Sequence, residues 1–123
     1  MYPEVNRFGI AELDRALKRI ARIDEKRARV VSAYFDDMKT CLERYHEALR
    51  KDGVCSLVIG PSRIRKILVP THAILRRLAE KTGFKFVESF ERTIDPARKQ
   101  TANAPNEYGG GAINEEHILV LRK

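Results

Sequence analysis

Apolar residues recur at helical spacing along the first fifty positions. From Ile10 onward they fall at steps of three and four residues with basic residues between them, which predicts a helix with one buried stripe. Asp24 is a candidate N-cap for a second helix running to about Leu49, whose wide apolar arc favours packing against a sheet. Gly53 is expected to end this helix in the left-handed conformation. Residues 1–9 have little periodicity, so we expect an irregular lead-in.

Three apolar stretches farther along the chain predict strands. The uncharged run Val54–Ile59 is too short for a helix and is followed by a glycine, which indicates a strand buried on both faces. Residues 84–90 alternate in part, and residues 117–121 form another uninterrupted apolar run typical of a central strand. Between the first two strands, Thr71 is a candidate N-cap for a third helix that ends at Gly83.

The order of these elements constrains the sheet. Residues 95–114 have no apolar period, so we expect a long loop there rather than the crossover helix of a parallel connection. The last strand should then lie between the other two, antiparallel to its predecessor. The prediction is one α/β domain over residues 1–123, with about three helices and a three-stranded mixed sheet. The strand Val54–Ile59 keeps an unpaired edge, which predicts a homo-oligomer or a partner subunit.

Composition adds a basic surface to this picture. The net charge is +7, and residues 60–99 contain ten Lys and Arg against four Asp and Glu. This excess of positive charge favours an anionic binding partner. The competing interpretation is that the basic side chains form a solvated surface that binds nothing. Cys41 and Cys55 lie in apolar settings, as expected for reduced core residues of a cytoplasmic protein. We expect neither a signal peptide nor a membrane span, which needs about 18 uncharged residues.

No arrangement of reactive side chains predicts a catalytic or metal site. His46, His72 and His117 are far apart, without Cys or carboxylate partners at ligand spacing, and are expected to be packing or surface residues. Ser62 has no predictable base partner. Adjacent carboxylates, such as those at residues 115 and 116, point apart and do not share a proton.

Several short motifs, taken in order, resemble those of one enzyme family. Over about residues 24–123 the chain resembles the C-terminal half of S-adenosylmethionine-dependent DNA methyltransferases that act on exocyclic amino groups. The resemblance implies a partial Rossmann-like fold whose final strand inserts antiparallel between its two predecessors. It also implies methyl transfer to adenine N6 or cytosine N4. The motifs are Tyr34-Phe35-Asp36-Asp37-Met38, His46-Glu47-Ala48-Leu49-Arg50-Lys51-Asp52-Gly53, Val58-Ile59-Gly60-Pro61-Ser62-Arg63-Ile64-Arg65, Val69-Pro70-Thr71, Gly83-Phe84 and Glu115-Glu116-His117-Ile118-Leu119-Val120-Leu121-Arg122-Lys123.

Two motifs of that family do not occur in this sequence. Such enzymes hold the methyl donor with a Gly-rich turn after their first strand and polarise the target amine with an Asp/Asn-Pro-Pro-Tyr/Phe motif. The glycines 109–111 precede the last predicted strand, so they cannot be the cofactor turn. We therefore expect one half of a split enzyme or a truncated copy, which uses S-adenosylmethionine only when completed by an N-terminal half.

The resemblance implies DNA contacts in two loops. Residues 61–70 follow the first strand at its carboxyl end, where ligands bind in open α/β sheets and cationic side chains can neutralise phosphates. Tyr108 could stack on an extruded base, and a tyrosine that only anchors its loop is the competing interpretation. Arg76, Arg77 and Lys81 are expected to form a solvated helix face. The alternative function is a non-catalytic basic module that binds nucleic acid or a protein. The candidate DNA-binding residues are Ser62, Arg63, Arg65, Lys66, Arg98, Lys99 and Tyr108.

Overall fold

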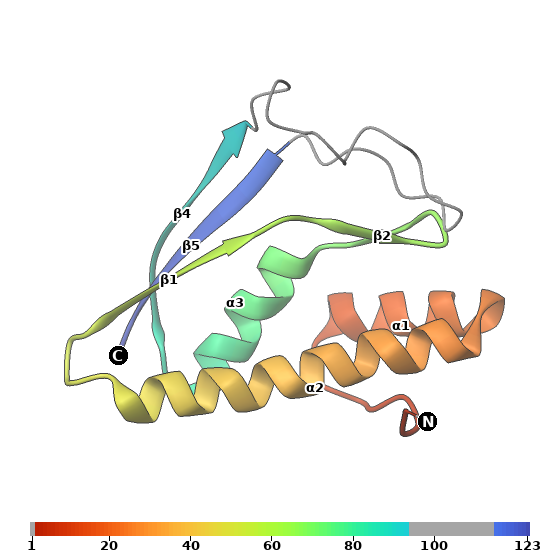
Figure 1. Cartoon of the computed structure of the whole chain (residues 1–123), viewed down its shortest axis with the longest axis horizontal. Helices are drawn as coiled ribbons and strands as arrows, with labels where there is room; N and C mark the ends of the chain where they lie inside the picture. The colour runs from red at the N-terminus through yellow and green to blue at the C-terminus, as the bar shows by residue number, and fades with distance from the viewer. Residues whose placement is uncertain (1, 94–114) are drawn as a thin grey trace.

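The computed structural model describes residues 2–93 and 115–123 (Figure 1). The predicted lead-in is irregular as far as it is described, and the predicted loop over residues 95–114 lies outside the described residues. No described helix is long and apolar enough to cross a bilayer. The elements in chain order are α1 (Ala11–Ile23), α2 (Glu25–Ala48), β1 (Val54–Ile59), β2 (Ser62–Ile64), β3 (Ile67–Val69), α3 (Thr71–Thr82), β4 (Lys85–Thr93) and β5 (Glu115–Arg122).

The main sheet has three strands in the order β1-β5-β4. The last strand is therefore central and antiparallel to its predecessor, and the chain has three helices, as predicted. The prediction of a mixed sheet is wrong in its pairing, because β5 is antiparallel to both neighbours. Among the described strands nothing pairs with the other side of β1, so its predicted free edge is present.

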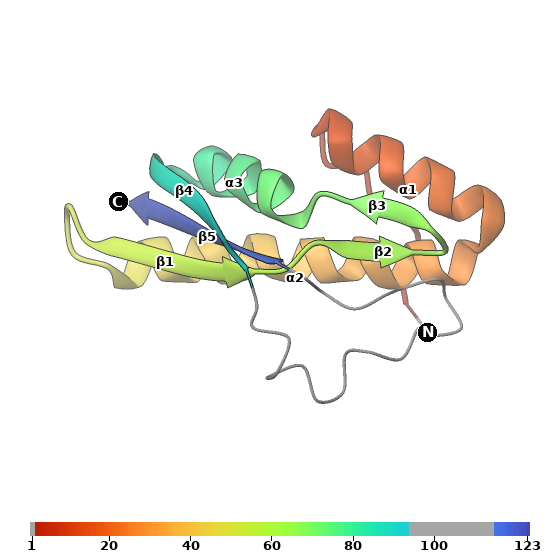
Figure 2. The same cartoon turned by 90° about the horizontal axis from the view of Figure 1, so that it is seen from above.

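Helices α2 and α3 lie on one face of this sheet, and α1 packs against α2 and β3. Viewed from above, β1, β5 and β4 lie in front of α2 and α3 (Figure 2). The side chains of His117, Leu119 and Leu121 alternate along β5 and are buried on the helix side. They join a core that contains Phe35 and Leu42 of α2. We call this covered side the inner face of the sheet.

The prediction that β1 is buried on both faces is wrong. Its side chains alternate, with Cys55, Leu57 and Ile59 toward the core, whereas Val54 is 57% and Val58 is 59% exposed. The reason is that no described helix covers the opposite side, which we call the outer face. The uninterrupted apolar run thus reflects one buried face and one bare apolar face.

Residues 61–70, predicted to be a loop, form a second antiparallel sheet. Strands β2 and β3 make a hairpin in which Ile64 pairs with Ile67. The two turn residues, Arg65 and Lys66, have φ of 52° and 68°. Two successive left-handed residues match the tightest hairpin turns, which usually contain Asn or Gly. The sequence has neither residue there, so the turn was not recognised.

The ends of α2 follow the prediction in part. The Asp24 carboxylate accepts a hydrogen bond from the Arg27 backbone N–H at 3.0 Å, which confirms the N-cap. At the other end the left-handed residue is Asp52, with φ of 64°, and not Gly53 as predicted. Gly53 is needed for a different reason, because an added Cβ would lie 2.9 Å from the Arg50 carbonyl oxygen.

The ends of α3 give one correction. Its N-cap is Pro70 rather than Thr71, whose hydroxyl donates a hydrogen bond to the Val69 carbonyl at 3.3 Å. No side-chain cap hydrogen bond forms at this end of the helix. Gly83 ends the helix with φ of 117°, as predicted.

Candidate functional site

Two adjoining clefts lie at the carboxyl end of β1, where the sequence predicts ligand binding. One, of about 340 Å³, separates α2 from the hairpin of β2 and β3. The other, of about 250 Å³, lies beside the end of β1. Both are lined by Tyr34, Ser62 and Thr71, so they share a boundary. A larger cleft of about 370 Å³ lies away from β1, between the lead-in, α2 and α3.

The wall of the first cleft is mainly apolar, whereas polar and apolar groups contribute equally to the wall of the second. The first is lined by Val30, Val31, Phe35 and Ile64 besides the shared residues. The second adds Met38, Leu57 and Leu75. Concave apolar walls with a few hydroxyls suit a flat ligand that offers hydrogen-bonding groups on its edge.

Tyr34 and Ser62 supply the hydroxyl groups most open to such a ligand. The Tyr34 ring packs edge-on against Phe35, with 4.9 Å between ring centroids, and partial burial raises the pKa of its phenol. The phenol is therefore a neutral donor and acceptor at pH 7. Ser62 was a sequence candidate, whereas Tyr34 was noted only as part of a motif. Its position one turn before Met38 on the apolar arc of α2 is the signal that could have identified it.

The three basic residues of the hairpin differ in their exposure to solvent. Arg63 and Lys66 are exposed, and Arg63 shares the outer side of the hairpin with its pairing partner Leu68. Arg65 is different, since its Nε lies 3.6 Å from Asp24 Oδ2 and is buried without a hydrogen bond. Arg65 therefore holds the turn against the start of α2, while Arg63 and Lys66 face solvent.

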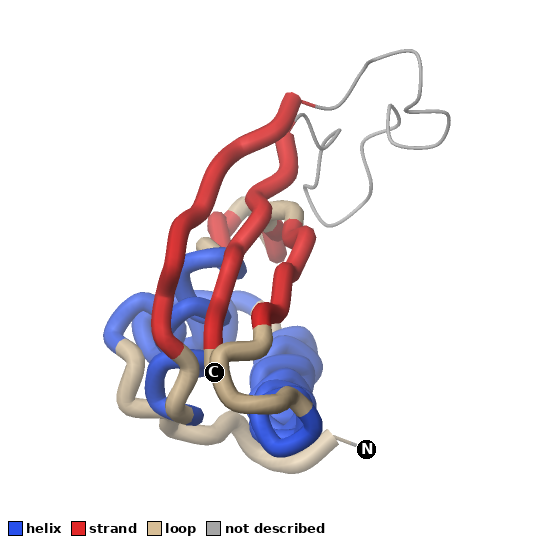
Figure 3. The backbone as a smooth tube through the Cα atoms, turned by 90° about the vertical axis from the view of Figure 1, so that its left-hand side faces the viewer, coloured by secondary structure: helices blue, strands red, loops and turns tan. Residues whose placement is uncertain are grey.

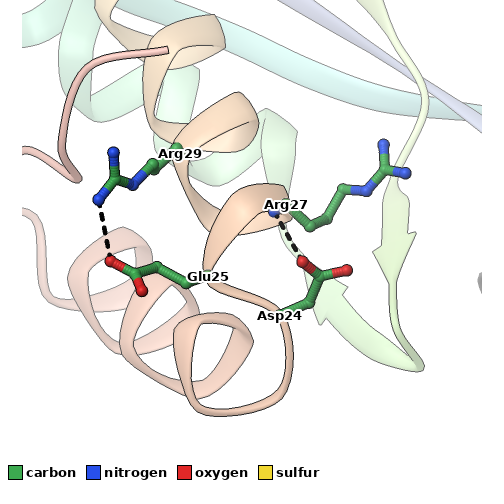
Figure 4. A network of polar contacts seen from close by, with 4 residues as sticks. All are labelled: Asp24, Glu25, Arg27 and Arg29. Atoms are coloured by element: carbon green, nitrogen blue, oxygen red, sulfur yellow. Dashed lines mark hydrogen bonds and ion pairs between the residues drawn. The ribbon is translucent and has the colours of Figure 1, made fainter. Parts of the chain in front are cut away.

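The start of α2 anchors the hairpin. Asp24 uses Oδ1 to cap the helix at the Arg27 backbone N–H (Figure 4). Its Oδ2 faces Arg65. One turn on, Glu25 and Arg29 form an exposed ion pair at 3.1 Å. This pair lies within α2 and contributes little to stability. Asp24 is a polar link between the helix and the hairpin. Sequence reasoning identified Asp24 as a cap but missed its contact with the basic turn.

The three basic residues predicted to form a solvated helix face all have structural partners. The Arg76 guanidinium lies 3.5 Å from the centre of the Phe86 ring. Arg77 pairs with Glu12 at 3.2 Å, and the Lys81 ammonium donates to the Phe8 carbonyl at 3.1 Å. These contacts connect α3 to β4, α1 and the lead-in, which favours a structural role. The remaining candidates, Arg98, Lys99 and Tyr108, lie outside the described residues.

The histidines are less dispersed than the sequence suggests. His46 packs edge-on against Phe84, with ring centroids 5.0 Å apart, so it is a packing residue as predicted. His72 and His117, in contrast, stack face to face. Burial lowers the pKa of His72, and the neighbouring His117 lowers it further, against the opposing effect of two nearby glutamates. The His72 imidazole is therefore neutral at pH 7.

Comparison of the chain with protein-family models, with curated proteins and with solved structures finds no match.

Proposed function

We propose that this chain is the C-terminal part of a site-specific DNA methyltransferase, which transfers a methyl group from S-adenosylmethionine to an exocyclic amino group of adenine or cytosine. A partner half would complete the sheet across the free edge of β1. The observation that carries the proposal is the strand order β1-β5-β4, with the last strand central and antiparallel to both neighbours. That order is the one that the resemblance in the sequence leads us to expect.

The bare side of the sheet supports a partner. Val58 of β1, Ile118 of β5 and Phe90 of β4 are paired in register and form an apolar row across the outer face. Val58 is 59% and Phe90 47% exposed. A row of this kind beside an unpaired strand edge is costly in a free-standing domain, because both attract other chains. A partner that adds a strand to β1 and covers the outer face would bury both.

The described residues do not fit the methyl donor. A donor site of the family's type needs a Gly-rich turn between a strand and the helix that follows, and no described turn has that sequence. The turn between α2 and β1 contains a single glycine, Gly53, which follows a helix. We therefore assign the donor and the proton-accepting motif to the partner half and derive no reaction step from this chain.

The share of this chain would be to receive the DNA. The clefts at the end of β1 offer apolar side chains and the hydroxyls of Tyr34 and Ser62 to a flat base. Arg63 and Lys66 lie on the adjoining hairpin, where they can neutralise phosphates on either side of that base. Unstacking a base from the duplex is necessary for chemistry on its amino group, and a cleft of this type suits the extruded base.

Reconstitution tests the proposal. The chain is mixed with an N-terminal methyltransferase half that carries the Gly-rich turn and the Pro-Pro-Tyr motif, taken from the neighbouring reading frame. We expect transfer of radiolabelled methyl groups to DNA only when both halves are present. Inactivity of a properly folded complex of the two halves would contradict the proposal, and so would tight S-adenosylmethionine binding by this chain alone in calorimetry.

A matched pair of variants separates docking from general damage. Val54→Lys puts a charge on the outer face of β1, away from the clefts, where we expect it to prevent reconstitution. Val87→Lys puts the same charge on β4, at the opposite edge of the sheet, where Val87 is 49% exposed. This control should retain most of the reconstituted activity. Equal loss in both variants would mean that β1 is not the docking edge.

The basic hairpin favours a second candidate, a non-catalytic nucleic-acid-binding module. Two left-handed residues in its turn and a basic exposed side are features of a functional segment rather than of a plain connection. Under this alternative the chain alone binds DNA, and Arg63→Gln with Lys66→Gln weakens that binding. Arg77→Gln is the control, because Arg77 is paired with Glu12. DNA binding without any reconstituted methyl transfer would favour the module over the enzyme.

A further inference from the structure

Three ligand-type side chains converge at one end of the sheet, apart from the clefts. Glu91 of β4 pairs in register with His117 of β5, and Glu115 lies two residues before His117 on the same strand. Cross-strand partners and residues two apart share a face of the sheet, so all three side chains lie on the inner face. The ends of β4 and β5 extend beyond the helices (Figure 3). The side chains of Glu91 and Glu115 are 64% and 47% exposed to solvent.

The side chain of His117, at the centre of this cluster, is almost fully buried but makes no hydrogen bond to the described residues. Its side chain is only 10% exposed, and its Nδ1 lies 3.9 Å from Glu91 Oε1 while its Nε2 lies 4.0 Å from Glu115 Oε1. Both separations are too long for hydrogen bonds. Within the described part of the chain neither ring nitrogen has a hydrogen-bond partner, and a glutamate carboxylate lies near each of them.

A second imidazole fixes the orientation of the first. The rings of His72 and His117 are stacked with centroids 3.7 Å apart and planes within 7° of parallel. The Nδ1 atom of His72 is buried and has no hydrogen bond in the described residues. His72 is at the start of α3, so its position is set by the helix. The ring of His117 is therefore preorganised, whereas the two glutamate side chains, 64% and 47% exposed, can move.

We propose that Glu91, Glu115 and His117 bind a first-row divalent transition-metal ion such as Zn²⁺. One ligand atom from each residue lies within 4.8 Å of the other two. Zinc–nitrogen and zinc–oxygen bonds are about 2.0–2.2 Å long, so two ligands of one ion are at most about 4.4 Å apart. Glu91 now lies beside Nδ1 and Glu115 beside Nε2, so binding one ion at one ring nitrogen requires the exposed glutamate side chains to rotate toward that nitrogen. Imidazole with two carboxylates suits zinc, iron or manganese better than magnesium, which prefers oxygen ligands and water.

The competing arrangement is a protonated His117 between two carboxylates. It would make long, weak ion pairs and would require no metal. The two arrangements differ in how the protein responds to added ions. They also differ in what happens when one exposed carboxylate is neutralised.

Metal titration of the purified chain tests the site. Thermal unfolding and calorimetry are measured with Zn²⁺ or Mg²⁺, on the wild type and on Glu91→Gln, Glu115→Gln and Glu88→Gln. Glu88 is the matched control, because it is on β4 but pairs with Val120 on the outer face. We expect Zn²⁺ to raise the midpoint of wild type and Glu88→Gln. Glu91→Gln and Glu115→Gln should each weaken binding at least about tenfold, since one ligand is lost.

Cobalt gives a spectroscopic check. Co²⁺ bound by one imidazole and two carboxylates should show visible d–d bands without the near-ultraviolet charge-transfer band of a thiolate ligand, which separates this site from Cys41 and Cys55. The proposal is overturned if Zn²⁺ leaves the wild-type midpoint unchanged. It is also overturned if Glu91→Gln and Glu88→Gln bind zinc equally well. None of these measurements needs a partner half, so their outcome is independent of the proposed methyltransferase function.

Discussion

The two faces of the sheet both carry large apolar side chains but differ in their surroundings. On the inner face, Leu119 and Leu121 are almost completely buried beneath the helices. On the outer face, Val58, Ile118 and Phe90 form a row that is as apolar, yet no described element covers it. The hydrophobic effect acts on both faces alike, so a chain that places aliphatic side chains on both is suited to a partner on the second.

The largest expected difference between the faces is in stability. Leu121→Ala removes a fully buried side chain and should lower the free energy of unfolding by about 2–5 kcal/mol. Val58→Ala removes an exposed side chain and should change it by no more than about 0.5 kcal/mol. Urea unfolding followed by circular dichroism measures both. Similar losses in the two variants would mean that the outer face is covered in solution, even in the purified chain.

The next effect concerns the link between the helices and the hairpin. Asp24→Ala removes the N-cap of α2 and the partner of Arg65, so it should lower the free energy of unfolding by about 1 kcal/mol. Glu25→Ala breaks only an exposed ion pair and should cost about 0.5 kcal/mol or less. The same unfolding experiment compares them. If Glu25→Ala proved as costly as Asp24→Ala, the anchoring role of Asp24 would be wrong.

A smaller expected difference between the two faces is the rate at which a cysteine on each face reacts with an alkylating reagent. Cys55 is on the inner face of β1, and burial raises the pKa of its thiol, so less of the reactive thiolate is present at pH 8. A cysteine at the exposed position 58 should react several-fold faster with an alkylating reagent. Labelling is followed by mass spectrometry in two variants that each contain one cysteine. The first combines Val58→Cys with Cys41→Ser and Cys55→Ser, and the second is Cys41→Ser, which retains only Cys55. Faster labelling of Cys55 would reverse the assignment of the two faces.

Much of this fold follows from local patterns in the sequence. Helical spacing predicts α1 and α2, Asp24 caps α2, and the lack of an apolar period in the sequence before β5 predicts the central, antiparallel position of that strand. The prediction that β1 is buried on both faces was wrong because the sequence pattern is ambiguous. An uninterrupted apolar run occurs in a strand that is covered on both faces and also in a strand that exposes one apolar face. The hairpin was missed because Arg65 and Lys66 occupy a turn that usually contains Asn or Gly.

The functional sites are predictable only in part. Ser62 lies at the end of β1 as expected, because the end of a buried strand can be read from the sequence. The stacking of His72 on His117 depends on a contact between residues 45 positions apart, and no local pattern encodes it. One sequence signal pointed to the proposed metal site. Glu115 and His117 are two residues apart in a predicted strand, so their side chains share a face of the sheet.

The central claim is that β1 and the outer face are built to be covered by another chain. Sedimentation velocity of the isolated chain over a range of concentrations, with Val58→Lys measured in parallel, tests it most directly. We predict that the wild type self-associates increasingly with concentration, because no described residue pairs with the free edge of β1 or covers the apolar row, and that Val58→Lys stays monomeric. A wild-type chain that remains monomeric at high concentration, with well-dispersed amide resonances, would contradict the account.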